Sequence, residues 1–74
     1  MEEFKLYNVA LQQDLYQFLT TKIIDIFILE NKETLLTEIH IKIDKDTLLI
    51  YKYIKYEYAV NDISILTTLK NYIK

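Results

Sequence analysis

The residues able to do chemistry are few in this chain, and they are spread apart. His40 is the only imidazole and Ser64 the only serine among 74 residues. They fall on different predicted elements, so no nucleophile can be paired with a base. Asp44 and Asp46 offer oxygen ligands for a hard cation, but the glycine and distal glutamate of an EF-hand loop are missing. We therefore interpret the segment around Asp44 and Asp46 as a turn, and we expect His40 to be an exposed strand residue.

Three residue types that build many functional sites are absent: glycine, proline and cysteine. Without glycine the chain has no phosphate-cradling loop, and without cysteine it has no disulfide, zinc knuckle or thiol nucleophile. The eleven carboxylates show no pairing of the glycosidase type. The sequence predicts a non-enzymatic protein without cofactor or metal.

Length and charge restrict the partners. A chain of 74 residues forms one domain, 1–74, with a core small enough that self-association or a protein partner would add useful stability. The hydrophobic fraction of 51% is too high for a disordered tail. Nine lysines, no arginine and a net charge of −2 make nucleic acid an unfavourable partner.

The N-terminus and the amino-acid usage suggest a compartment and a source. The first three residues, Met1, Glu2 and Glu3, include two acidic side chains where a signal peptide is basic. The apolar run at 23–29 is too short to cross a bilayer. We expect a cytoplasmic protein that makes no membrane contact. Residues with AT-rich codons fill almost half of the positions, which indicates a low-GC genome and a phage or another mobile element as the source.

The first predicted element is a helix, because apolar residues recur at steps of three and four. The stripe consists of Phe4, Tyr7, Leu11, Leu15 and Phe18. Asn8 is suited to cap a helix over 9–20, but a start near Glu2 also fits, and the two starts stay open.

Three segments, 22–30, 34–43 and 48–60, then alternate in the manner of strands, with short Asn- and Asp-containing connections typical of antiparallel hairpins. Hairpins closed at 31–32 and at 44–47 give the pairs Ile28–Leu35, Ile26–Thr37, Ile24–Ile39, Ile43–Leu48, Ile41–Ile50 and Thr37–Ile54. Both hairpins place isoleucines on one side, an agreement that a slip of one residue would destroy. The same register sets Asp25 opposite Glu38, which is unfavourable.

The last predicted element is a helix capped by Asn61, with Asp62 near its start and Lys70 and Lys74 near its end. Its apolar stripe is Ile65, Leu66, Leu69, Tyr72 and Ile73. The predicted fold class is a two-layer α+β domain of order αβββα, in which both helices pack on one face of a three-stranded antiparallel meander. The alternative extends the first helix through Leu29 and leaves αββα.

The predicted fold leaves one face of the sheet uncovered. The helices would cover Ile24, Ile26, Ile39, Ile41 and Ile50. The opposite face would carry Phe27, Leu29, Leu36, His40, Leu49, Tyr51 and Tyr53, which we predict to bind a protein partner because contiguous apolar and tyrosine-rich surfaces are typical of interfaces. The alternative is that the N-terminal segment wraps over this face.

These expectations lead to one functional hypothesis and two alternatives. The first is a protein–protein interaction module, such as a phage accessory protein acting as an inhibitor of a host protein or redirecting it. The second is a homodimeric structural subunit that uses the same face. The third is a weak binder of single-stranded nucleic acid, because Tyr51, Tyr53 and Lys55 would share a face on which bases can stack.

Overall fold

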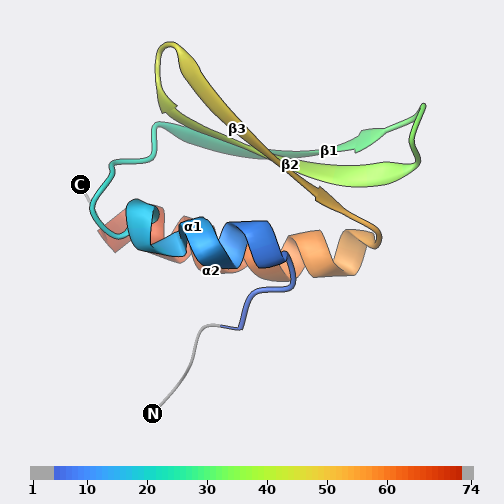
Figure 1. Cartoon of the computed structure of the whole chain (residues 1–74), viewed down its shortest axis with the longest axis horizontal. Helices are drawn as coiled ribbons and strands as arrows, with labels where there is room; N and C mark the ends of the chain where they lie inside the picture. Colours follow the sequence, from blue (N-terminus) through green and yellow to red (C-terminus); the bar gives the residue numbers. More distant parts are fainter. Residues whose placement is uncertain (1–4, 73–74) are drawn as a thin grey trace.

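The computed structural model describes residues 5–72, which form a helix, three strands and a second helix in chain order (Figure 1). The elements are α1 (Val9–Phe18), β1 (Asp25–Asn31), β2 (Leu36–Asp44), β3 (Thr47–Tyr53) and α2 (Tyr56–Tyr72). The strands form one antiparallel sheet of order β1-β2-β3. The predicted αβββα order is confirmed, and the αββα alternative is wrong because residues 25–31 form a strand.

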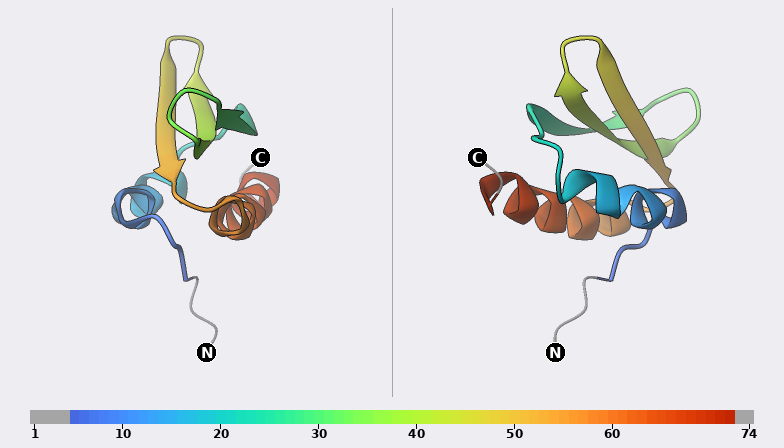
Figure 2. Two further views of the ribbon diagram at one scale, coloured as in Figure 1. Left: turned by 90° about the vertical axis from the view of Figure 1, so that its right-hand side faces the viewer. Right: turned by 60° about the vertical axis from the view of Figure 1, so that its left-hand side comes forward.

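The domain has two layers, a sheet and a pair of helices that lie side by side beneath one of its faces (Figure 2). The core fills the space between these layers, and its largest fully buried apolar residues come from both helices and the central strand: Leu11, Phe18, Ile39, Ile41 and Leu66. The other face of the sheet carries no helix in the part of the chain that the structure describes (Figure 1).

Helix α1 begins where the capping residue predicts. The Asn8 side chain accepts a 2.9 Å hydrogen bond from the Leu11 amide, which confirms the start at Val9. Leu11 and Phe18 are buried, as the stripe predicts, and the helix ends at Phe18, two residues earlier than expected. Glu2, the other start considered, and the stripe residue Phe4 lie outside the described residues.

The first hairpin is paired four residues away from the predicted register. Ile26 lies opposite Ile41, and Ile28 lies opposite Ile39. Because the displacement is even, both isoleucines of β1 still face the helices. The same displacement places Asp25 opposite Lys42, so the predicted clash with Glu38 does not occur.

A four-residue turn closes this hairpin. The Asn31 side chain accepts hydrogen bonds from the amides of Glu33 at 2.9 Å and Thr34 at 3.2 Å, as an asparagine does when it organises a turn. Leu35 has a φ of 61°, in the left-handed region that disfavours a residue with a Cβ. The turn therefore contains one strained position, where a glycine would be the ordinary residue.

The second hairpin differs from the predicted register by one residue. Asp44 pairs with Thr47 at the turn, but Lys42 pairs with Leu48, so an irregularity between Lys42 and Asp44 leaves Ile43 unpaired. Because side chains alternate along a strand, this bulge reverses every side chain of β3 relative to the prediction.

The reversal exchanges the predicted faces of β3. Leu49 lies opposite Ile41, Tyr51 opposite Ile39, and Tyr53 opposite Thr37, all on the side of the helices. Ile50 was predicted to be buried, but it is 49% exposed on the other side. Ile24 precedes β1 and is also exposed, which corrects its predicted place in the core.

Helix α2 begins at Tyr56, so the predicted strand over 48–60 ends early at Tyr53, and Asn61 is inside the helix instead of capping it. The apolar period that governs this segment runs through Ala59, Leu66 and Leu69, which are buried. The predicted stripe residue Ile73 and the terminal Lys74 lie outside the described residues.

Candidate protein-interaction surface

Two tyrosines that were predicted to bind a partner instead hold the layers together. Tyr51 and Tyr53 are 5% and 4% exposed. The Tyr51 hydroxyl donates a 2.7 Å hydrogen bond to Asp14 of α1, and the Tyr53 hydroxyl donates one of 2.9 Å to Asp62 of α2. Burial, reinforced by the adjacent carboxylates, raises the pKa of both phenols well above its ordinary range. Neither ring is accessible to a partner protein or to a stacking base, so their predicted placement was wrong.

Asp62 is the polar centre of this inner region. Its buried carboxylate accepts hydrogen bonds from the Tyr7 amide at 2.9 Å, the Asn8 amide at 3.1 Å and the Tyr53 hydroxyl. The ring of Tyr7 also stacks on that of Tyr58 in α2, with centroids 4.4 Å apart. The N-terminal segment is therefore attached on the helix side, and between Lys5 and Asn8 it does not wrap over the free face of the sheet.

We call the free side of the sheet the outer face. Large apolar side chains lie on its two edge strands, β1 and β3. The residues of the outer face alternate along the three strands and are Asp25, Phe27, Leu29, Asn31, Leu36, Glu38, His40, Lys42, Leu48, Ile50 and Lys52. Phe27 and Leu29 are 40% and 37% exposed, and Leu48 and Ile50 are 46% and 49% exposed. These four large apolar side chains flank the central strand from both sides.

The predicted set is only partly assembled on this face. Phe27, Leu29, Leu36 and His40 lie together on it, whereas Leu49, Tyr51 and Tyr53 lie on the inner side. The sequence did not place Leu48 and Ile50 on this face. Leu48 lies where Leu49 was predicted, and Ile50 lies where Tyr51 was predicted. An exposed surface on β3 was predicted, but because of the bulge it is formed by the residues that were predicted to be buried.

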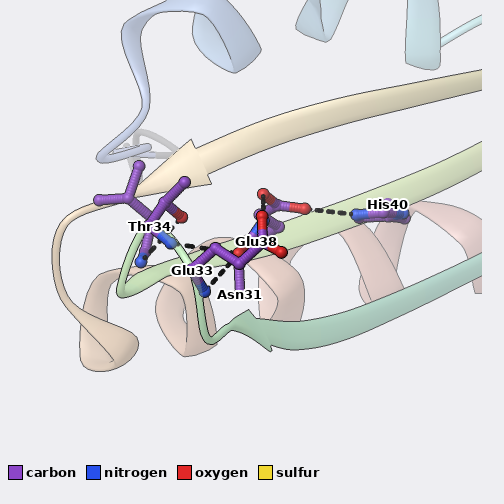
Figure 3. Close-up of polar contacts among 6 residues, drawn as sticks. Asn31, Glu33, Thr34, Glu38 and His40 are labelled. Carbon is purple, nitrogen blue, oxygen red and sulfur yellow. Dashed lines mark hydrogen bonds and ion pairs between the residues drawn. The ribbon is translucent and has the colours of Figure 1, made fainter.

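A hydrogen-bonded pair occupies the middle of the outer face (Figure 3). His40 Nε2 and Glu38 Oε1 are 2.9 Å apart, and Asn31 Nδ2 donates a 3.2 Å hydrogen bond to the other oxygen of Glu38. The hydrogen bond with His40, followed by that from Asn31, lowers the pKa of the Glu38 carboxyl. The His40 side chain is 14% exposed and its ring centroid lies 5.3 Å from that of Phe27, which corrects the expectation of an exposed strand residue. The pair lies beside the Phe27 ring, and both oxygens of the Glu38 carboxylate have polar partners.

An open hollow extends the outer face toward the β2–β3 hairpin. Phe27 and Leu48 form its apolar part, and Lys42 and Lys45 line it together with Asp25. The hollow therefore combines an apolar part with two lysines and two aspartates, Asp25 and Asp46.

Within the described residues, the candidate catalytic side chains lie apart. His40 lies on the outer face, whereas Ser64 belongs to α2 on the other side of the sheet, so the two do not form a catalytic pair. Within residues 5–72, no group of three or more His, Asp or Glu side chains is placed to hold a metal ion. Asp44 accepts a 2.8 Å hydrogen bond from the Asp46 amide, which confirms that this segment is a turn.

Comparisons with known proteins add no assignment: no family model, no curated protein and no solved structure matches this chain. Neither of the two helices in the described part of the chain has the length and apolar character that crossing a bilayer requires.

Proposed function

We propose that this chain is a non-enzymatic protein-interaction module and that its outer face binds another polypeptide. The observation that carries this proposal is the set of large apolar side chains on β1 and β3, on a sheet face that residues 5–72 leave without a covering layer: Phe27, Leu29, Leu48 and Ile50. Single exposed apolar residues are ordinary, but several large ones on one face of a sheet in a small domain are typical of a binding surface.

The polar centre of the face also favours burial by a partner. Covering an unpaired polar group would lower affinity, because that group would lose its water without gaining a new partner. Glu38 and His40 are already hydrogen-bonded to each other, and no buried side-chain nitrogen or oxygen in the described residues lacks a partner. A partner can therefore cover the Glu38 carboxylate without leaving either of its oxygens unpaired.

The narrower role of a phage accessory protein that inhibits or redirects a host protein stays a prediction from amino-acid usage. In that role, the outer face would be the surface that contacts the host protein. The nucleic-acid alternative loses its main support, because Tyr51 and Tyr53 cannot stack on bases while they are buried beneath the helices.

Affinity capture with matched baits tests the proposal. The wild-type chain is compared with Ile50→Lys on the outer face and with Tyr16→Lys, a control on α1 where the side chain is 82% exposed. Each variant adds one positive charge at an exposed position. The proposal expects a protein that the wild type and the control retain and that Ile50→Lys loses.

Methyl NMR then locates the contact on the purified complex. Binding should shift the methyl resonances of Leu29, Leu48 and Ile50 and leave that of Val60 on α2 unchanged. Shifts confined to the helices, or equal capture by all three baits, would contradict a role for the outer face.

A further inference from the structure

The part of the outer face in which all three strands pair has four corners, and their chemistry follows from the strand register. Asp25 on β1 and Leu48 on β3 occupy the two corners nearest the β2–β3 hairpin, because both pair with Lys42. Leu29 on β1 and Lys52 on β3 occupy the other two corners. The charged corners are therefore diagonal to each other and opposite in sign, and the two remaining corners are both leucines.

From this pattern we propose that the outer face binds a second copy of this chain, giving a two-fold symmetric dimer with the sheets face to face. This inference rests on the proposed function, because it names the occupant of the same surface. A surface that binds its own copy must be complementary to itself, since each residue meets the same patch across the symmetry axis.

Of the two diagonals that join opposite corners, only one can serve as a two-fold axis that brings opposite charges together. An axis through Leu29 and Leu48 brings Asp25 of each copy against Lys52 of the other, and it packs each leucine on its own equivalent. An axis through Asp25 and Lys52 would instead oppose like charges at both corners. The charge pattern thus favours one crossing of the sheets and disfavours the other.

A diagonal axis corresponds to a known way of packing sheets. Two sheets related in this manner cross at nearly a right angle, which is one of the two usual arrangements in β-sandwiches. The same axis lays the aliphatic stem of Lys42 over Ile50 of the second copy, so the lysine covers apolar surface while its ammonium group stays in water.

The resulting assembly has four layers, with helices on the outside and two sheets in the middle. Such an arrangement covers Phe27, Leu29, Leu48 and Ile50, which the single chain leaves partly exposed. A chain of 74 residues has a small core, and burying this face adds stability that the monomer lacks.

Sedimentation equilibrium over a wide range of protein concentration tests the inference. The wild type is compared with Asp25→Lys, with Lys52→Glu and with an equimolar mixture of the two variants. Each variant alone places like charges at both corner contacts, so its dimer dissociation constant should rise at least about tenfold. The mixture restores opposite charges at both contacts and should regain a dimer, now of one copy of each variant.

Two controls separate this effect from a change in net charge. Glu57→Lys on α2 and Lys22→Glu before β1 are exposed and change the charge by the same amounts, and they should dimerise like the wild type. Because Lys52→Glu brings a carboxylate beside Glu38, its folding is checked by circular dichroism. If Lys52→Glu is unfolded, Ile50→Lys takes its place as a test variant, because it must also weaken the dimer.

Two results would overturn the inference. One is a wild-type chain that stays monomeric up to millimolar concentration, which excludes a second copy but leaves the binding of a different protein to be decided by the capture experiment. The other is a dimer that neither charge variant nor Ile50→Lys weakens, which would place the contact elsewhere on the molecule.

Discussion

The Tyr53 hydroxyl donates a 2.9 Å hydrogen bond to the buried Asp62 carboxylate, and through this contact β3 is joined to α2. The same carboxylate accepts the amides of Tyr7 and Asn8 and so holds the start of α1. One carboxylate thereby connects the sheet with both helices, and the tyrosines of β3 have a structural role on the inner side.

Replacing Tyr53 by phenylalanine should lower the free energy of unfolding by about 2 kcal/mol, because a buried hydrogen bond to a charged acceptor is lost while the ring is kept. Urea unfolding followed by circular dichroism measures the change. Tyr16→Phe is the matched control, since that side chain is 82% exposed, and it should be neutral. Equal stability of the two variants would contradict the role assigned to Tyr53.

Ionisation of the buried phenols should limit stability in alkali. Burial and the neighbouring carboxylates raise the pKa of Tyr51 and Tyr53 above the ordinary value of 10.0. The folded-state pKa exceeds that of the unfolded chain, so the contribution is complete below pH 10 and is lost as the pH rises beyond it. Absorbance at the phenolate band should show two of the seven tyrosines ionising only when the chain unfolds. Titration of all seven near pH 10 with the fold intact would disprove this.

The strained turn can be relieved at a single position. Leu35 has a φ of 61° and is 84% exposed, so Leu35→Gly removes the steric cost of the left-handed conformation without removing core contacts. The expected gain is about 1 kcal/mol in the free energy of unfolding, which thermal or urea unfolding measures. Leu35→Ala keeps the Cβ and should not share this gain. If alanine and glycine stabilise equally, the strain is not the cause.

Glu38 should make the domain sensitive to acid. Hydrogen bonds from His40 and Asn31 lower the pKa of this carboxyl from its ordinary value of 4.5. The stabilisation is therefore present above pH 4.5 and is lost as the pH falls through the lower folded-state pKa. Unfolding free energies measured from pH 6 to pH 3 should decline less in Glu38→Gln than in the wild type. Glu33→Gln, in the exposed turn, should follow the wild type.

The layer order and the helix α1 could be predicted from the sequence because their determinants are local. Asn8 lies directly before Val9 and caps α1, which is one of the two starts that the sequence left open. The first hairpin kept its faces although its register was wrong, because an error of four residues preserves the alternation of β1. Local periodicity thus sufficed for the order of the elements and for the inward orientation of Ile26 and Ile28.

The membership of the outer face could not be predicted in the same way. It depends on the bulge at Ile43, which adds one residue to β2 and leaves no mark in the alternation of the sequence. A usable indication lay in the helices instead. Asp14 falls within the apolar stripe of α1 and Asp62 within that of α2, and an acidic residue in a stripe requires a buried donor opposite. The tyrosines of β3 are such donors, and this pairing would have placed them inside.

Residue-resolved hydroxyl-radical footprinting of the folded chain tests most directly which side of β3 is exposed. Each rate is compared with that of the same residue in the urea-unfolded chain, at the lowest protein concentration that permits detection. Tyr51 and Tyr53 should be strongly protected, whereas Leu48 and Ile50 should react at a substantial fraction of their unfolded rates. Protection of Leu48 and Ile50 together with unfolded-like reactivity of Tyr51 and Tyr53 would contradict the account.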